Sequence, residues 1–189
     1  MIQEDKNMRL LIASDIHGDA ECCRAMLEAA QRENASKILI LGDILYHGPR
    51  NDLPSGYAPK EVIELLNSNA DKLLCVRGNC DTEVDQMVLS FPILSDTAFV
   101  YDGDCDVTLY MSHGHKYSPD CLPPLPAGSL FLYGHTHLLG LTEKDGIRCV
   151  NPGSVSLPKG GNKKTYAIYE NKSVEIKSFD GEIVEKFVF

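Results

Sequence analysis

The sequence predicts an α/β protein in which two β-sheets pack face to face with helices outside. The first half of the chain alternates short apolar runs with helical patterns, in a β-α-β-α-β order that is typical of parallel strands joined by crossover helices. The second half is a series of strand-like segments, and tight-turn pairs such as Asp180-Gly181 separate several of them. The end of the chain is therefore expected to form an antiparallel meander.

Apolar runs and helix-start signals define the elements of the first half. The three predicted strands are 8–13, 37–41 and 72–76. Asp19 can cap a helix over 20–33, in which apolar residues recur at the spacing of one helix face. Pro59 suits the first turn of a second helix, with Val62 and Leu66 on one face.

The second half contains more strands and a long loop. The predicted strands are 97–101, 107–111, 129–133, 148–151, 165–170, 173–179 and 182–189. Two connections, 42–58 and 112–128, are long and rich in Gly and Pro, and loops of this length in a small domain are often functional. We expect a single domain over 8–189, preceded by a short N-terminal extension, 1–7.

Composition excludes several classes of function. The net charge of −9 argues against duplex nucleic acid as a stable partner, because such binding depends on basic phosphate contacts. No apolar run approaches the ~20 residues that span a bilayer, so no membrane association is expected. The seven cysteines are odd in number and form no CxxC pair, which favours a reducing cytoplasm. The sequence does not determine the oligomeric state, and a homo-oligomer stays an open alternative.

Side chains that can bind metal follow five of the predicted strands directly. They are Asp15 and His17, Asp43, Asn79, His113 and His115, and His135 and His137. Ligands of open α/β sheets bind beyond the carboxyl ends of the strands, so these side chains can converge. In an extended chain, the two-residue spacing of Asp15 and His17, repeated at His135 and His137, would turn both side chains of each pair to one side.

The types of these side chains indicate a particular class of metal. Carboxylates, imidazoles and an amide oxygen without clustered thiolates suit Mn²⁺, Fe or Zn²⁺ better than Ca²⁺. Five of the six histidines lie in the strand-end motifs, and the sixth, His47, lies just after Asp43. The seven candidate ligands, which are these side chains without His115, are too many for one tetrahedral ion and suit two ions that share one carboxylate.

Five motifs occur in order between residues 15 and 137: D-x-H, G-D, G-N-C-D, H-G and G-H-x-H. Together they resemble the calcineurin-like metallophosphoesterase superfamily. The strings GDILYHGPRN (42–51) and NPGSVSLPKGG (151–161) are similar to the YfcE-type phosphodiesterases, which are small bacterial members of that superfamily. The resemblance implies a four-layer α-β-β-α sandwich of two mixed sheets.

The resemblance also implies two divalent metal ions. One ion would take Asp15, His17, Asp43 and His137, and the other would take Asp43, Asn79, His113 and His135. Asp43 would bridge them. Mn²⁺ is expected, with Zn²⁺, Fe or Ni²⁺ as alternatives, and hydroxide formed from a shared water would attack a small or nucleotide-like phosphodiester.

The expected catalytic residues are Asp43, Asn79, His47, Cys80 and Asp81. The expected substrate contacts are His47, Arg50, Arg77 and His115, and Arg50 could pair with a phosphate oxygen through two parallel hydrogen bonds. Cys80 stands where many superfamily members have His, which leaves the general acid open. The alternative is that residues 48–51 form a solvated surface turn with no role in substrate binding.

Two other functions stay open at this point. One is a phosphomonoesterase with the same two-metal centre, and the other is a non-catalytic scaffold that retains the fold. The complete ligand set argues against the scaffold. A serine nucleophile is not expected, because no G-x-S-x-G is present and Ser154 fits a backbone turn near the site better than a nucleophile elbow.

Overall fold

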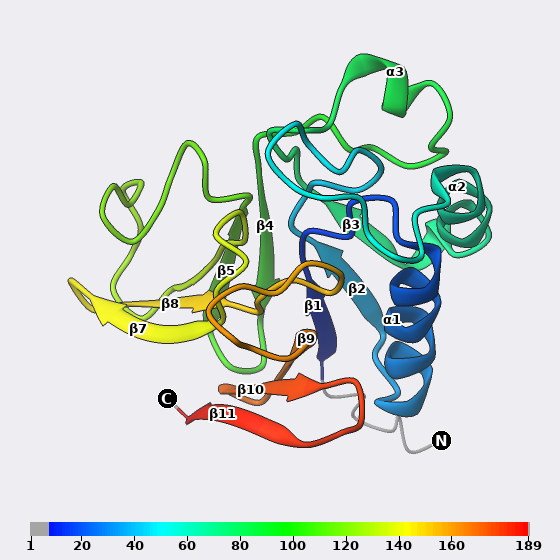
Figure 1. The fold of residues 1–189 in the computed structure, drawn as a ribbon. Helices are drawn as coiled ribbons and strands as arrows, with labels where there is room; N and C mark the ends of the chain where they lie inside the picture. Colours follow the sequence, from blue (N-terminus) through cyan, green and yellow to red (C-terminus); the bar gives the residue numbers. More distant parts are fainter. Residues whose placement is uncertain (1–7, 189) are drawn as a thin grey trace, which may run out of the picture.

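The apolar runs of the first half form the parallel centre of a six-stranded sheet (Figure 1). The computed structural model describes residues 8–188, so the predicted extension 1–7 lies outside it. Strands β1 (Arg9–Ala13), β2 (Lys37–Ile40) and β3 (Leu73–Cys75) pair in parallel, as predicted. Their near-continuous burial explains why they appear in the sequence as apolar runs and not as alternating patterns.

The C-terminal meander completes this first sheet. Strands β9 (Thr165–Glu170), β10 (Ser173–Ser178) and β11 (Ile183–Val188) pair antiparallel with one another. Strand β9 also pairs antiparallel with β1, which gives the order β11-β10-β9-β1-β2-β3. The last segment of the chain therefore returns to the first sheet and makes it mixed.

The strands between these segments form a second, five-stranded sheet. They are β4 (Thr97–Asp102), β5 (Val107–Ser112), β6 (Leu130–Leu132), β7 (Gly140–Lys144) and β8 (Ile147–Asn151), in the order β4-β5-β6-β8-β7. Strand β7 was not predicted. It lies at the edge of the sheet with its last three residues exposed, so it carries no apolar alternation that could identify it.

The two longer helices lie against the outer face of the first sheet. Helix α1 (Ala20–Arg32) begins as predicted at Asp19, whose side chain accepts a hydrogen bond from the backbone N–H of Cys22 at 2.9 Å. Helix α2 (Pro59–Asn67) follows, and a 3₁₀ turn (Ala70–Lys72) leads into β3. The one-turn helix α3 (Glu83–Gln86) was not predicted, because four residues are too few to give a periodic pattern.

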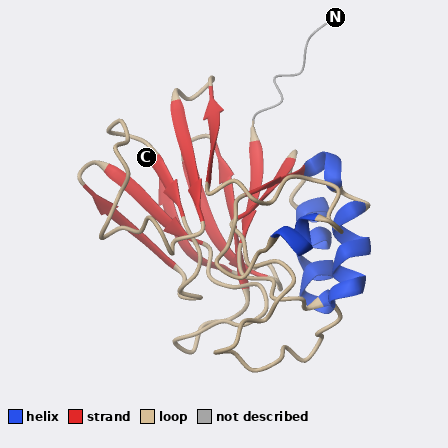
Figure 2. Ribbon diagram, turned by 90° about the horizontal axis from the view of Figure 1, so that it is seen from above, coloured by secondary structure: helices blue, strands red, loops and turns tan. Residues whose placement is uncertain are grey.

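The two sheets enclose an apolar core, and they differ in what covers their outer faces. Figure 2 shows the helices gathered on one side, where α1 and α2 cover the first sheet. Among residues 8–188, the outer face of the second sheet is covered by the 113–129 segment, whose Leu122 and Leu125 pack against Phe131. Four prolines between 119 and 126 explain why this fourth layer is a loop instead of a helix.

Parallel pairing places several strand ends at the same edge of the molecule. Strands β1, β2 and β3 run in one direction in the first sheet, and β5 and β6 run in parallel in the second. The loops that leave these five strands carry the predicted metal ligands. None of the helices within residues 8–188 combines the length and the apolar character that crossing a bilayer requires.

Candidate metal centre

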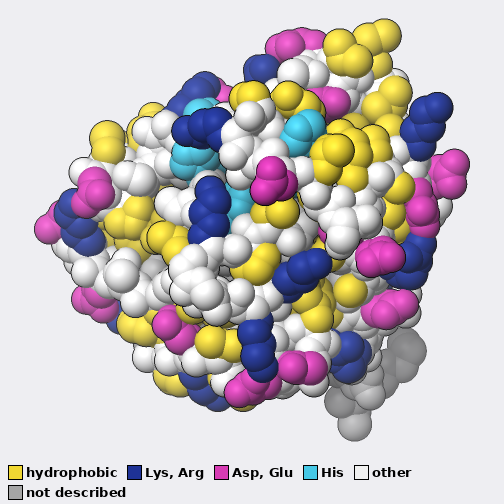
Figure 3. All heavy atoms as spheres, in the orientation of Figure 1, with side chains coloured by type: hydrophobic (Ala, Val, Ile, Leu, Met, Phe, Trp, Pro, Cys, Tyr) yellow, Lys and Arg dark blue, Asp and Glu magenta, His cyan; other side chains and the backbone are white. Residues whose placement is uncertain are grey.

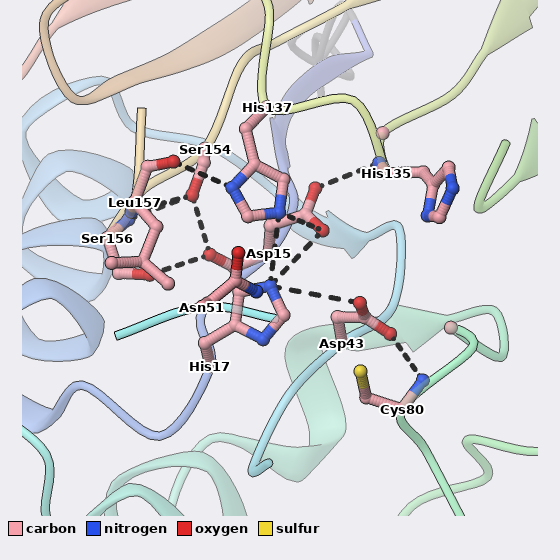
Figure 4. A network of polar contacts seen from close by, with 12 residues as sticks. Asp15, His17, Asp43, Asn51, Cys80, His135, His137, Ser154, Ser156 and Leu157 are labelled. Carbon is pink, nitrogen blue, oxygen red and sulfur yellow. Dashed lines mark hydrogen bonds and ion pairs between the residues drawn. The ribbon is translucent and has the colours of Figure 1, made fainter. Parts of the chain in front are cut away.

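The first group of candidate ligands consists of Asp15, His17 and His137, which come from the loops after β1 and β6. The Nε2 atom of His17 lies 3.6 Å from Asp15 Oδ1, and the Nε2 atom of His137 lies 3.4 Å from the same oxygen. The two Nε2 atoms are 3.2 Å apart. Figure 4 shows these three side chains pointing toward one another.

The second group surrounds His113, at the end of β5. Its Nε2 atom lies 3.1 Å from Asn79 Oδ1 and 3.3 Å from His135 Nδ1. Asp43 lies between the two groups, because its Oδ2 atom is 3.4 Å from His113 Nε2 and 3.8 Å from His17 Nε2. All seven side chains that the sequence singled out as metal ligands therefore lie together.

The backbone at these residues differs from the extended chain that we expected. Asp15, His17, Asp43, His135 and His137 all have positive φ angles, between 49° and 68°. The expectation that an extended chain turns each pair of side chains to one side was therefore wrong, although the side chains do converge. The left-handed conformation costs a non-glycine residue on the order of 1 kcal/mol, and such strain persists where the surrounding structure enforces it.

Backbone carbonyls fix the orientation of three imidazoles. The Nδ1 atoms of His17, His113 and His137 lie 2.7, 2.7 and 2.6 Å from the carbonyl oxygens of Tyr46, Leu41 and Leu157. A carbonyl oxygen can only accept, so each Nδ1 must carry the proton and donate it. The lone pair of each neutral ring is then on Nε2, which faces the carboxylates, as in histidines that bind metal.

Two observations show that this donor set fits a cation. The Oδ1 atom of Asp15 is buried and has no hydrogen-bond partner among the described residues. The Nε2 atoms of His17 and His137 face each other at 3.2 Å, and when both rings are neutral their two lone pairs repel unless a proton or a metal ion lies between them. A divalent ion bound by Asp15, His17 and His137 would give Asp15 Oδ1 a partner and would remove the repulsion between the two Nε2 lone pairs.

Without a metal, protons on the imidazoles offset the negative charge of the buried carboxylates. Burial acts to raise the pKa of Asp15, but the imidazoles of His137 and His17 outweigh it and lower the pKa. Burial likewise opposes charge on His113, but Asp43 and Asp15 raise the pKa of its imidazole to about 9. Metal ions and protons therefore compete for this centre.

Residues around the ligands hold the strand-end loops in place. The hydroxyls of Ser154 and Ser156 donate to the carbonyl oxygen of Asp15 at 2.8 and 2.9 Å. Ser154 thus lies in a turn beside the site, as expected. The positioning role of the two serines was not predicted, since they stand in a turn far along the chain with no local pattern to mark it.

Asp81, one of the expected catalytic residues, also holds the strand-end loops in place. Its Oδ2 accepts the backbone N–H groups of Asp43 and Gly78 at 2.9 and 2.7 Å, and its Oδ1 accepts that of Ile44 at 2.9 Å. Both oxygens are therefore occupied, and the side chain is not directed at the ligands. In this structure Asp81 is a positioning residue.

Two glycines let the loops approach closely. A Cβ atom on Gly78 would lie 2.1 Å from Asp43 Oδ1, and one on Gly134 would lie 1.9 Å from the hydroxyl of Ser14 and 2.9 Å from Asp15 Oδ2. Any side chain at these positions would displace a ligand.

Cys80 borders the centre as a thiol. Its Sγ lies within 4.8 Å of ligand atoms of His17 and Asp43, and its backbone N–H donates to Asp43 Oδ1 at 2.8 Å. Burial and the neighbouring Asp43 raise the pKa of the Cys80 thiol to about 12. The side chain is therefore neutral near pH 7, which excludes a thiolate nucleophile in the metal-free protein.

A polar cavity of about 350 Å³ opens beside the ligands. Arg50, one of the expected substrate contacts, lines it, and so do Asn51, Thr136 and Lys159, which we did not predict. Lys159 lies within the string NPGSVSLPKGG, but a single lysine beside glycines gives no sequence signal of its own.

The other expected substrate contacts lie elsewhere. Arg77 donates to the carbonyl oxygen of Asp81 at 3.1 Å and pairs with Glu83 at 3.3 Å, so its guanidinium is engaged away from the ligands. The ring of His47 packs edge-on against Tyr46 and Tyr57, and its buried Nδ1 has no partner among the described residues. His115 is exposed, with its ring 5.3 Å from that of His113.

Comparison with known proteins gives one consistent result. The calcineurin-like phosphoesterase superfamily domain matches residues 8–173. The chain is 44% identical to phosphodiesterase YfcE of Escherichia coli (strain K12) over 177 residues, which cover 94% of this chain and 95% of that protein. A solved structure of Yfce, described as a phosphoesterase from E. coli, has a TM-score of 0.92 at 43% identity and covers 96% of this chain and 99% of its own.

A more distant structure shares the fold alone. Vps29 from Entamoeba histolytica, solved with Zn²⁺, has a TM-score of 0.62 at 19% identity and covers 95% of this chain and 98% of its own. The family match and the YfcE similarity extend over most of the chain and include every ligand motif. The chain therefore belongs to the calcineurin-like phosphoesterase superfamily.

Proposed function

We propose that this protein is a phosphodiesterase that hydrolyses a small or nucleotide-like diester with two divalent metal ions. The observation that carries the proposal is the position of Asp43, whose Oδ2 faces His17 Nε2 on one side and His113 Nε2 on the other. One carboxylate oxygen between two groups of ligands suits a bridge between two ions. The similarity to phosphodiesterase YfcE supports the reaction class.

Each ion has its own ligands in this proposal. Asp15, His17 and His137 would hold the first ion, and Asn79, His113 and His135 would hold the second, with Asp43 shared. The donor set of nitrogen and oxygen atoms suits Mn²⁺, and Zn²⁺, Fe and Ni²⁺ fit it as well. When bound, such ions act as Lewis acids in the hydrolysis of phosphate esters.

The cavity beside the centre supplies the contacts for substrate. Arg50 and Lys159 lie on its wall in a chain of net charge −9, so they form a local positive site for a phosphate group. Arg50 can orient the phosphate with a bidentate pair of hydrogen bonds, whereas Lys159 offers a point charge. Asn51, held by its Nδ2–H to the carbonyl oxygen of His47 at 2.8 Å, keeps the loop that carries Arg50 folded toward the cavity.

The nature of the ester can be tested directly. Purified protein is stripped of metal, analysed for residual ions and reloaded separately with Mn²⁺, Zn²⁺ or Ni²⁺. We expect bis(4-nitrophenyl) phosphate to be hydrolysed much faster than 4-nitrophenyl phosphate, with two ions bound per chain. A preference for the monoester would favour a phosphomonoesterase instead, and two bound ions without turnover of either ester would favour a scaffold.

The free cysteines fit a reducing compartment. All seven thiols lie within the described residues and none forms a disulfide. We therefore propose a cytoplasmic location, which fractionation of cells that produce the protein would test.

A further inference from the structure

An apolar groove lies directly beside the polar cavity. It has a volume of about 400 Å³, and its walls include Leu45, Tyr46, Tyr57, Ile63, Val84 and Val88. Cys80 lines both the groove and the cavity, so the groove begins where the cavity ends. In Figure 3, hydrophobic side chains gather next to histidines on the upper part of the face shown.

Three segments line the groove, and two of them leave the candidate metal ligands. One is the loop after Asp43, another is residues 82–88, which follow Asn79 and Cys80, and the third is the start of helix α2 with Ile63. The chain that positions the centre thus also positions the groove. The groove therefore adjoins the candidate site, because the Cys80 side chain lines both the groove and the cavity.

Three of the apolar side chains that line the groove are open to solvent. Val84 is 69% exposed, Val88 is 45% exposed and Tyr46 is 42% exposed. Exposed apolar side chains gathered at the rim of a groove are suited to contact another apolar group. Charged side chains are found among its lining only as Lys60 and Asp85.

The chemistry of a diester fits this pairing of a polar cavity with an apolar groove. A phosphodiester carries two organic groups, and a phosphate held near Arg50 and Lys159 leaves one of them facing Cys80. A thiol offers that group a small apolar surface, and aromatic rings such as those of Tyr46 and Tyr57 stack readily on another flat ring. A water-soluble, fully polar group would gain nothing from these walls.

We propose that the groove binds one ester group of the substrate and that this group is flat and apolar, such as an aromatic ring. The inference rests on the proposed phosphodiesterase function and adds the chemical class of the substrate. Val84 and Tyr46 then determine specificity without contacting the phosphate.

A matched pair of substrates tests the inference. Phenyl 4-nitrophenyl phosphate and methyl 4-nitrophenyl phosphate share the leaving group and differ in the second ester group. We expect wild-type protein to prefer the phenyl ester in kcat/KM. Val84→Asp should lower the phenyl-to-methyl ratio about tenfold, the factor expected when roughly 50 Å² of apolar surface loses its contact.

The new carboxylate repels both anionic diesters, so this effect cancels in the phenyl-to-methyl ratio of kcat/KM. Val84→Leu keeps the wall apolar and should preserve the ratio. Val188→Asp introduces the same charge at an equally exposed valine, 69% in both cases, at the far end of the first sheet, and should leave both rates unchanged.

A binding measurement gives a second reading that does not depend on turnover. With Zn²⁺ as a diamagnetic ion, diphenyl phosphate should shift the methyl resonances of Val84 and Val88, whereas dimethyl phosphate should not. Equal shifts from both compounds would overturn the inference.

The outcomes also separate this inference from the proposed function. Absence of hydrolysis of either diester would refute the phosphodiesterase. Hydrolysis of both with a ratio that Val84→Asp does not change would overturn the groove alone. A wild-type dimer that Val84→Asp converts to monomer, with the ratio unchanged, would instead make the groove an interface between two copies of the chain.

Discussion

The two halves of the metal centre differ in their access to solvent. Asp15, His17 and His137 are fully buried or nearly so. In the other half, His113 is buried, but Asn79 is exposed and His135 is half-buried. One half is therefore enclosed by protein, while the other opens toward the cavity that would receive the substrate.

The support behind each half differs as well. Carbonyl oxygens of Tyr46 and Leu157 hold both imidazoles of the enclosed half, and two serine hydroxyls hold the carbonyl of Asp15. In the open half, the described residues provide such an anchor for His113 alone. We therefore expect the enclosed half to hold a metal ion more tightly than the open half.

The largest effect should come from the residue that both halves share. We expect Asp43→Asn to reduce diester hydrolysis by about 10³-fold or more and to lower the metal content, because a neutral amide cannot offset charge on two ions. Elemental analysis and initial rates measure both quantities. Asp104→Asn, in an exposed turn, is the control, and two full ions with normal turnover in Asp43→Asn would contradict the shared role.

A comparison of one ligand from each half should give the next largest effect. His137→Ala should weaken the tighter of two binding steps by about 100-fold, since it removes an anchored ligand from the enclosed half. His135→Ala should leave the tighter step intact and abolish the weaker one. Calorimetric titration of metal-free protein resolves the two steps, and identical losses in both variants would show that the halves are equivalent.

The pH dependence should distinguish metal-free from metal-loaded protein. The pKa of His113 is raised from its usual 6.5 to about 9 by Asp43 and Asp15 against the effect of burial. A raised pKa contributes stability that is complete below pH 6.5 and is lost as the pH rises through 9. We therefore expect the Tm of metal-free protein to fall over this interval.

Metal affinity should move in the opposite direction. If one proton leaves His113 when the ion binds, affinity should rise by about tenfold per pH unit between 6.5 and 9. Thermal unfolding and metal titration at several pH values check the two trends. An affinity that does not change with pH would show that no proton is displaced.

The smallest effects should come from the cavity loop. Arg50→Ala should lower kcat about tenfold with full metal content, and Arg50→Lys should recover part of the loss because it restores charge without the bidentate geometry. His47→Ala should have a weaker effect, since its ring contacts Tyr46 and Tyr57 and does not line the cavity. A larger loss in His47→Ala than in Arg50→Ala would reverse this assignment.

Sequence patterns singled out the side chains that the structure brings together, because strand ends are easy to recognise. An apolar run followed by Asp, Asn or His marks both the strand and the point where the chain leaves it, and the parallel order brings those points together. The Asp19 cap and the Pro59 helix start were found in the same way, from local chemistry that does not depend on the rest of the fold.

Contacts between side chains and backbone groups that are far apart in the sequence could not be predicted from local patterns. The carbonyls of Leu41, Tyr46 and Leu157 anchor three imidazoles, and a carbonyl is present at every residue, so no pattern distinguishes these. Asp81 stands in a ligand motif, and only its three amide contacts show that it supports the loop instead of facing the ligands. The replacement of the fourth helical layer by the 113–129 segment likewise depends on how that loop packs.

The close approach at Gly78 and Gly134 has a consequence for mutational tolerance. In a saturation scan read out by metal retention, these two positions should be as intolerant as the ligands, although neither carries a side chain. Gly140, around which a Cβ atom would meet nothing within 4 Å, should accept most replacements. Metal binding thus also requires residues whose only role is to leave room for the loops that carry the ligands. A list of functional residues based on side-chain chemistry alone would omit them.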